Sequence, residues 1–352
     1  MDKKPNEPEK SQKVKKPKTK TSLRDKILIW VFSLIMAASL LCVAGVYAMN
    51  ATFFQEKEDP EIQEASRASG MATPQEIKHK SVNILVTGID YTVKAGNRRG
   101  KLTDVILLVS FDMENRNVDV LQIPRDTYVG DASSTGKINA LYSSKEGGGI
   151  NGLMNKINQM FQIPIDHYVT INMDGFIYAV DAVGGVEVDV PKGFTLEGVT
   201  IQAGKQVLDG AHAEKFVRER HAYADADLGR IRMQQLFLEA LLKKAFSLSL
   251  GQATSLASSL ISQVTTDLTL NDILGYYQEL MKVDLSEIHF HLLPVTGTMV
   301  NGQSVLSIKR YPTADLLNED FRIFQSPVPA ESLGIIELVK DYEYSSAASG
   351  NP

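Results

Sequence analysis

Residues 81–90 read SVNILVTGID, a short apolar run that ends near a glycine and is followed by an aspartate. This pattern is typical of a buried β-strand that leads into a loop. Two further apolar runs, VILLVSF at 105–111 and VDVLQI at 118–123, flank the polar residues 112–117. This spacing predicts a β-hairpin after the first strand, so the folded domain is expected to begin near Ser81.

After these strands, apolar residues recur with the spacing of a helix in some segments and with the spacing of a strand in others. Helices are expected at residues 150–161, 174–183, 229–246 and 249–265. Further strands are expected at residues 167–172, 186–190 and 288–294. His289 and His291 alternate on the last of these strands and are assigned to one solvated or partly buried face. Strands that alternate with helices predict an α/β or α+β domain in which helices pack on a sheet.

Charge is unevenly distributed along the 352 residues. The net charge is -5, but residues 1–26 hold ten Lys and Arg against four Asp and Glu, so the remainder is clearly acidic. A nucleic-acid-binding protein would carry its basic residues on the folded domain, and no nucleic-acid partner is therefore expected.

An uncharged apolar run of 22 residues, at 27–48, follows the basic tail. A bilayer-spanning helix needs about 20 apolar residues, and the hydrophobic region of a cleavable signal peptide is usually about 7–15, which favours an uncleaved anchor over that alternative. The preceding basic residues place the N-terminus in the cytoplasm and the domain outside the cell membrane. The expected order is a cytoplasmic tail at 1–26, a single transmembrane helix at 27–48, an extracellular stalk at 49–79, a folded domain at 80–330 and a C-terminal tail at 331–352.

Two acidic residues flank the first two predicted strands. Asp90 follows the first strand and Asp104 precedes the second. If these strands are neighbours, both carboxylates can meet at one edge of the sheet, where they would suit Mg²⁺ with phosphate oxygens as further ligands. An aspartate beside a strand is more often a turn or cap residue, so the metal site stays one of two interpretations.

Arginines are dense around residue 225. Arg218, Arg220, Arg230 and Arg232 lie within fifteen residues, and Arg125 lies in the segment IPRD. On a strand, Arg218 and Arg220 would point to the same side. Guanidinium groups match phosphate oxygens in bidentate fashion, so such a cluster could bind a diphosphate. The alternative is a surface set of ion pairs with nearby acidic residues, namely Glu214, Glu219, Asp225 and Asp227.

A series of short motifs follows one order along the chain. In that order they are NILVTGID (83–90), Thr103-Asp104, IPRDTY (123–128), KINA (137–140), IPIDHY (163–168), VGGVEV (183–188), LDG (208–210), VRERH (217–221) and DLGR (227–230) ahead of Gln234-Gln235. With these motifs, and with an anchor helix before the domain, the sequence resembles the LytR-CpsA-Psr family of cell-wall glycopolymer transferases.

This resemblance implies a fold, a reaction and a set of site residues. The family fold is an α/β/α sandwich with a mixed central sheet and a cleft for a polyprenyl tail. Its Mg²⁺-dependent enzymes transfer an undecaprenyl-diphosphate-linked anionic glycopolymer, teichoic acid or capsular polysaccharide, to peptidoglycan through a phosphodiester bond. By the same resemblance, Asp90 and Asp104 would bind Mg²⁺ and Asp227 would activate the acceptor hydroxyl. The diphosphate would be bound by Arg125, which also counts as catalytic, and by Arg218, Arg220, Arg230 and Gln234.

The sequence departs from the family pattern at several positions. Tyr91-Thr92 follows the first aspartate where the family usually has Ser-Arg, and Leu102 and Met233 stand where arginines are usual. These departures motivate an alternative, a non-catalytic protein that binds polyprenyl diphosphate and regulates wall-polymer assembly. A transcription attenuator is a further alternative, although residues 1–26 are too few for a helix-turn-helix.

Overall fold

The computed structural model describes residues 80–89, 102–143, 148–219, 227–322 and 324–339, while the side chains of 227 and 228 are outside its description. The predicted tail, transmembrane helix and stalk lie outside these ranges. Among the described helices, none has the length and apolar character needed to cross a bilayer.

A hairpin forms the centre of the sheet. Strand β1 (Ser81–Ile89) pairs antiparallel with β2 (Thr103–Asp112), and β2 pairs antiparallel with β3 (Asn117–Gln122). The Asp112 carboxylate accepts the backbone N–H groups of Glu114 and Asn115, both at 2.9 Å, and so closes the turn between β2 and β3. The predicted first strand and hairpin are confirmed.

Three more strands complete a mixed sheet of order β10-β3-β2-β1-β4-β9. Strand β4 (His167–Asn172) runs parallel to β1, β10 (Ile288–Leu292) runs parallel to β3, and β9 (Val264–Thr266) pairs antiparallel with β4. The predicted helix at 249–265 is wrong in its last part, because α7 (Leu250–Leu260) ends before residues that add an edge strand to β4.

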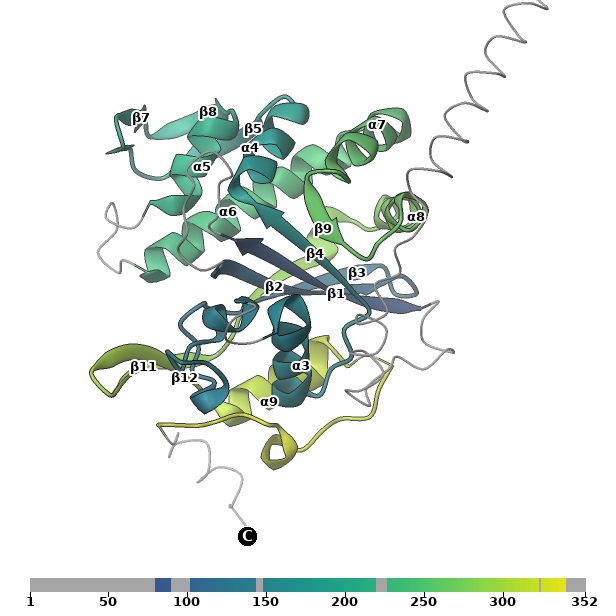
Figure 1. Cartoon of the computed structure of the whole chain (residues 1–352). Helices are drawn as coiled ribbons and strands as arrows, with labels where there is room; N and C mark the ends of the chain where they lie inside the picture. The colour runs from purple at the N-terminus through teal and green to yellow at the C-terminus, as the bar shows by residue number, and fades with distance from the viewer. Residues whose placement is uncertain (1–79, 90–101, 144–147, 220–226, 323, 340–352) are drawn as a thin grey trace, which may run out of the picture. The chain divides into compact units, whose positions relative to one another are not determined.

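Helices cover both faces of this sheet, as Figure 1 shows. One face packs against α3 (Gly149–Phe161) and α9 (Arg310–Asp320), where Leu85, Leu108 and Leu121 lie fully buried. The opposite face packs against α6 (Asp227–Phe246) and α8 (Leu270–Leu280). The predicted α/β fold with a mixed central sheet is therefore confirmed.

Residues beyond the expected domain boundary at 330 also join the core. Leu333 and Ile335 are about as buried as the sheet residues that they pack with. The guanidinium group of Arg310 donates to the backbone carbonyls of Ala330, Leu333 and Ile335 and holds this segment in place.

A smaller cluster packs on the outer side of α6. Helices α4 (Met173–Ala182) and α5 (Gly210–Arg218) enclose it together with β5 (Val186–Val190) and β8 (Gly204–Leu208). Met233 and Phe237 of α6 pack into this cluster while Leu238 faces the sheet, so α6 joins the two parts of the core. The remaining elements are β6 (Phe194–Leu196), β7 (Val199–Ile201), β11 (Val295–Val300), β12 (Gln303–Ile308) and the 3-10 turns at Gly130–Ala132, Ile138–Tyr142, Leu285–Glu287 and Ala330–Ser332.

Candidate functional site

An ion pair lies at the edge of the sheet where β2 begins. Nη1 of Arg125 donates to Oδ1 of Asp104 at 2.6 Å, and the two side chains are only 20% and 27% exposed. Because Thr103 pairs with Ile89, this edge is also where β1 ends. The structure therefore brings together two predicted residues that come from different strand ends.

The segment that carries Arg125 is fixed from several sides. Its carbonyl accepts the N–H of Asn139 at 3.2 Å, and its Nε lies 3.5 Å from Oδ2 of Asp126. Lys137 in turn donates to Oδ1 of Asp126 at 2.8 Å. Two carboxylates thus orient the guanidinium group, while Lys137 adds a further positive charge that the sequence analysis did not single out.

A pair of side-chain amides links this edge to the arginine-rich segment. Nε2 of Gln122, at the end of β3, donates to Oε1 of Gln234 on α6 at 3.1 Å. Nε2 of Gln234 donates to the carbonyl of Val217, next to Arg218 at the end of α5, at 3.3 Å. These contacts bring the end of β3, the first turns of α6 and the end of α5 to one place. Gln122 was not predicted, although it lies three residues before Arg125.

The predicted arginines have different environments within this arrangement. Arg230 lies one helical turn before Gln234 on α6 and is only 4% exposed. Arg218 is 40% exposed, and its guanidinium group pairs with Glu214 one turn earlier and with Glu197 at 3.6 Å. The ion-pair interpretation is thus realised for Arg218, so a phosphate there would compete with two carboxylates.

The backbone conformation of Arg218 settles a question that the sequence left open. Arg218 would share one side with Arg220 only on a strand, but it is the last residue of α5. The Asp209 side chain caps this helix by accepting the N–H of His212 at 2.9 Å, and Ala213 and Phe216 bury the face toward the smaller cluster. A cap followed by apolar residues at helical spacing outweighs the alternation of charges in VRER.

Three predicted site residues cannot be located in this geometry. Asp90 and Arg220 lie outside the described residues, and so does the side chain of Asp227, the first residue of α6. The structure describes the remaining members of the predicted set: Asp104, Arg125, Arg218, Arg230 and Gln234.

The departures from the family pattern have distinct structural settings. Met233 is 5% exposed and packs with Phe216 and Phe237, so this position belongs to an apolar cluster. Leu102 is 39% exposed just before β2 begins. An arginine in the Met233 position would have to place its charge among aromatic rings, which explains why a methionine suits this chain.

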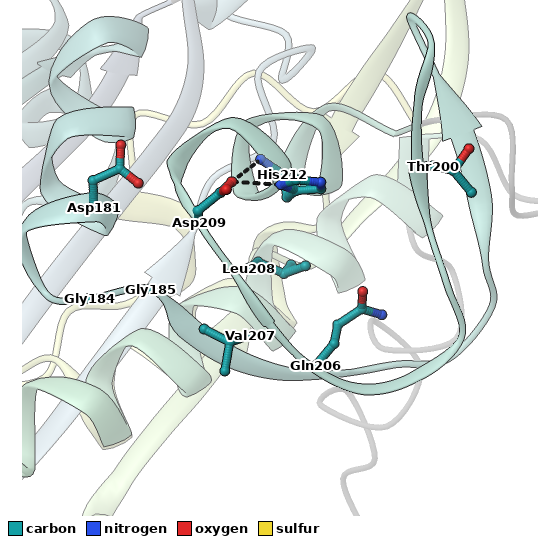
Figure 2. Close-up of a pocket in the computed structure, with 9 residues that line it drawn as sticks. All are labelled: Asp181, Gly184, Gly185, Thr200, Gln206, Val207, Leu208, Asp209 and His212. Atoms are coloured by element: carbon teal, nitrogen blue, oxygen red, sulfur yellow. Dashed lines mark hydrogen bonds and ion pairs between the residues drawn. The ribbon is translucent and has the colours of Figure 1, made fainter.

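A polar cavity of about 270 Å³ lies at the opposite end of α5 from Arg218 (Figure 2). Asp181 and Asp209 line it together with Thr200, Gln206 and His212. Asp181 also accepts the N–H of Gly210 at 2.7 Å. The described lining of this cavity includes none of the predicted site residues, so we do not assign it to the candidate site.

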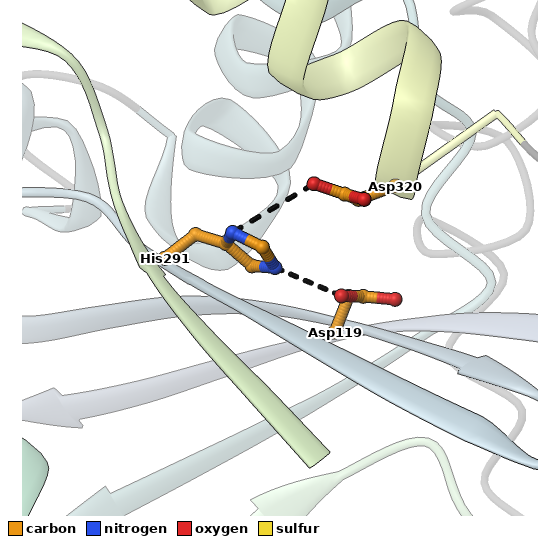
Figure 3. A group of neighbouring side chains, drawn as sticks. All are labelled: Asp119, His291 and Asp320. Atoms are coloured by element: carbon orange, nitrogen blue, oxygen red, sulfur yellow. Dashed lines mark hydrogen bonds and ion pairs between the residues drawn. The ribbon is translucent and has the colours of Figure 1, made fainter. Parts of the chain in front are cut away.

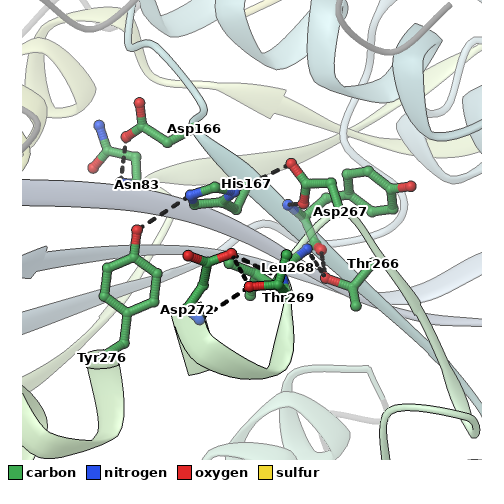
Figure 4. Close-up of polar contacts among 10 residues, drawn as sticks. Asn83, Asp166, His167, Thr266, Asp267, Leu268, Thr269, Asp272 and Tyr276 are labelled. Carbon is green, nitrogen blue, oxygen red and sulfur yellow. Dashed lines mark hydrogen bonds and ion pairs between the residues drawn. The ribbon is translucent and has the colours of Figure 1, made fainter. Parts of the chain in front are cut away.

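A second polar group lies at the other end of the sheet, where β4 begins (Figure 4). Nδ1 of His167 lies 3.2 Å from Oδ2 of Asp267, and Nε2 of the same ring lies 3.2 Å from the hydroxyl oxygen of Tyr276. Burial by itself lowers the pKa of His167. The hydrogen bond to Asp267 and the negative charges of Asp267, Asp166 and Asp272 have a larger effect together, so the pKa is raised above its usual value of 6.5. Burial and the same carboxylates raise the pKa of Tyr276 to about 12.

The fold and the candidate site define an α/β protein with cationic and carboxylate groups gathered at one edge of a mixed sheet. The sequence model of the LytR_cpsA_psr family matches residues 45–321. The chain therefore belongs to the LytR-CpsA-Psr family, as its motifs indicated.

Named relatives agree with this assignment. The polyisoprenyl-teichoic acid–peptidoglycan teichoic acid transferase TagU of Bacillus mycoides is 31% identical over 255 residues, which cover 70% of this chain and 81% of TagU. The corresponding transferase TagV of Bacillus subtilis is 32% identical over 261 residues, which cover 70% of this chain and 65% of TagV. The crystal structure of TagV superposes with a TM-score of 0.57 at 29% identity, over 66% of this chain and 91% of that one.

Proposed function

We propose that this chain transfers a polyprenyl-diphosphate-linked anionic glycopolymer to peptidoglycan at the cell membrane. Membership of the family and the activity for which TagU and TagV are named support a transferase. The observation that carries the assignment to this site is that two sets of contacts lie at one sheet edge, the ion pair of Arg125 with Asp104 and the bonds of Gln234 to Gln122 and Val217. The proposal includes an anchor at 27–48 that would hold the domain beside its lipid-linked substrate.

The proposed reaction exchanges one phosphorus–oxygen bond for another. An acceptor hydroxyl of peptidoglycan attacks the phosphorus atom attached to the glycopolymer, and the bond from that phosphorus to the bridging oxygen breaks. The products are a glycopolymer–peptidoglycan phosphodiester and polyprenyl phosphate, which departs with the bridging oxygen. The hydroxyl proton passes to a base, a role that we assign to Asp227 from the family motif alone.

Positive charge near the diphosphate would stabilise both the transferring and the leaving phosphate. Arg125 is suited to this role because Asp104 and Asp126 orient its guanidinium group before substrate binds. Arg230 is largely removed from water, which strengthens its interaction with an anion. Gln234 would donate an amide hydrogen bond and keeps α6 against the end of β3.

Mg²⁺ fits the donor chemistry of this edge. A carboxylate oxygen is a hard ligand of the kind that Mg²⁺ prefers, and Asp104 is partly exposed at the sheet edge. Asp104 would therefore hold the ion, with Asp90, which follows Ile89 directly in the sequence, as the second ligand. When bound, the ion would neutralise charge on the diphosphate.

A transfer assay with the full chain in lipid vesicles tests this proposal. The vesicles contain a polyprenyl-diphosphate-linked polymer, peptidoglycan fragments are added with Mg²⁺, and polymer joined to peptidoglycan is measured. Arg230→Lys should lower the rate by about 100-fold, since removing one charge-stabilising donor typically costs 10²–10³. Arg232→Lys is the matched control, because Arg232 is exposed on the same helix, and it should retain the rate.

The non-catalytic alternative makes a different prediction in the same experiment. A regulator that only binds the lipid would retain polyprenyl diphosphate but produce no polymer–peptidoglycan conjugate with Mg²⁺ present. That result would reject the transferase. Equal rates for the two arginine variants would instead show that the reaction takes place elsewhere on the chain.

A further inference from the structure

Three potential metal ligands meet at the β10 edge of the sheet, and none of them belongs to the candidate transferase site. Asp119 lies on β3, His291 on the edge strand β10, and Asp320 at the end of α9 (Figure 3). Nε2 of His291 lies 2.8 Å from Oδ1 of Asp119, and its Nδ1 lies 3.7 Å from Oδ2 of Asp320. One ligand atom from each residue lies within 4.8 Å of the others. Because the two carboxylates lie at different ring nitrogens, the three side chains can share one ion at Nε2 once the partly exposed Asp320 side chain turns toward Asp119.

Neighbouring residues hold two of the ligands in orientation. The side chain of Asp119 is only 2% exposed, and Nδ2 of Asn117 donates to its Oδ2 at 3.0 Å, which leaves Oδ1 directed at His291. The His291 ring packs edge-on against Phe321, with ring centroids 5.8 Å apart and planes at 71°. Supporting contacts of this kind are typical of metal sites, where a second set of residues orients the ligands.

An adjacent cavity supplies access and room for water ligands. It has a volume of about 680 Å³, and its lining includes His289, His291 and Asp320 together with Gln235 and Glu239 of α6. An ion bound by three protein side chains could complete its coordination with water from this cavity. The cavity is thus the entry path that a metal site requires.

Charge also favours a cation at this position. With His291 neutral, the carboxylates of the buried Asp119 and of Asp320 carry a net charge of −2. Proton uptake by His291 would compensate half of this charge, whereas a divalent ion would compensate all of it. The cost of burying an uncompensated carboxylate makes full neutralisation favourable.

We propose that Asp119, His291 and Asp320 bind a divalent transition-metal ion of the Zn²⁺ class. An imidazole nitrogen with two carboxylate oxygens suits such ions, whereas Mg²⁺ and Ca²⁺ take oxygen ligands. The ion would join β3, β10 and α9, elements that come from distant parts of the chain. This proposal is independent of the transferase assignment, because Asp119 lies on the sheet face beside Asp320 of α9, whereas Gln122, three residues later on β3, points to the opposite face and bonds to Gln234 of α6.

The site is tested by calorimetric titration, in which Zn²⁺ is added to the metal-stripped full chain in detergent and the heat of binding is measured. The wild type should bind one equivalent, and Co²⁺ in its place should give a visible absorption band. His291→Gln should weaken Zn²⁺ binding by at least about 100-fold, since even supporting residues of metal sites contribute about 10–100-fold. His212→Gln is the matched control, because His212 pairs with Asp209 on α5 and lies on none of the elements that carry the proposed site, and this variant should bind Zn²⁺ as the wild type does.

Two more variants distinguish this site from the proposed Mg²⁺ site and from a change in folding. Asp320→Asn keeps the size of a partly exposed side chain and should also lose binding, while its metal-free melting temperature, followed by circular dichroism, stays near that of the wild type. Asp104→Asn should keep Zn²⁺ binding, because Asp104 belongs to the proposed Mg²⁺ site. Unchanged Zn²⁺ affinity in His291→Gln and Asp320→Asn, or loss of binding in His212→Gln, would overturn the proposal and identify an adventitious ion.

Discussion

Replacing Gln234 by alanine tests whether its amide holds the candidate site together. Gln234 is 9% exposed, and it bonds to Gln122 at 3.1 Å and to the Val217 carbonyl at 3.3 Å. Each bond is worth about 0.5–1.5 kcal/mol net, and both former partners lose a buried contact. Gln234→Ala should therefore lower the free energy of unfolding by about 1–3 kcal/mol.

The neighbouring glutamine provides a matched control. Gln235 bonds only to Glu239 in the described structure, at 3.1 Å on the same helix face. An i,i+4 pair of this kind is worth about 0.2–0.5 kcal/mol, and alanine recovers part of that through its higher helix propensity. Gln235→Ala should consequently change the stability by less than about 0.5 kcal/mol.

Urea denaturation of the full chain in detergent, followed by circular dichroism, measures both effects. With a slope of about 3 kcal/mol/M, the midpoint of Gln234→Ala should fall by about 0.3–1 M at an unchanged slope. The midpoint of Gln235→Ala should move by less than about 0.2 M. Equal shifts for the two variants would refute the idea that Gln234 joins β3, α5 and α6.

Three other changes probe the helices and the opposite end of the sheet. Gly210→Ala should destabilise by about 1–3 kcal/mol, because the new Cβ would lie within 2.4 Å of the Ile177 carbonyl oxygen. Gly251→Ala should instead stabilise by about 0.5–1 kcal/mol, since that helical position is open, and urea midpoints measure both. The raised pKa of His167 means that its interaction with Asp267 stabilises the fold fully below pH of about 6.5 and is lost as pH rises through the folded-state pKa. The stability advantage of the wild type over His167→Gln should therefore shrink between pH 6 and pH 8.5, and a constant difference would contradict this.

Much of the central sheet could be predicted from local sequence. The runs at 81–89, 105–111 and 118–123 are short and apolar, and they correspond to strands β1, β2 and β3. The hairpin at β11–β12 was readable but missed. Its loop is Asn301-Gly302, with positive φ values of 50° and 76°, a pairing typical of two-residue hairpin turns.

The candidate site was only partly accessible to sequence reasoning. Chemistry alone singled out Asp104 and Arg125 as groups suited to metal and phosphate, but only packing shows that they form an ion pair with each other. The role of Arg218 depends on whether VRER is helical or extended, and its pattern favours neither on its own. Capping by Asp209 and burial of Phe216 decide in favour of a helix.

By itself, the sequence determined the family, the positions along the chain of most strands of the central sheet and the residue types able to bind a phosphorylated substrate. These properties depend on local patterns and on motifs in a fixed order. Only the tertiary structure decided which distant side chains meet, as Gln122 meets Gln234 and Asp119 meets His291 across 172 positions of sequence. Such contacts follow from the order of strands and the helices that cover them, and no local pattern encodes that order, because the free energy that selects it comes from burying apolar faces together.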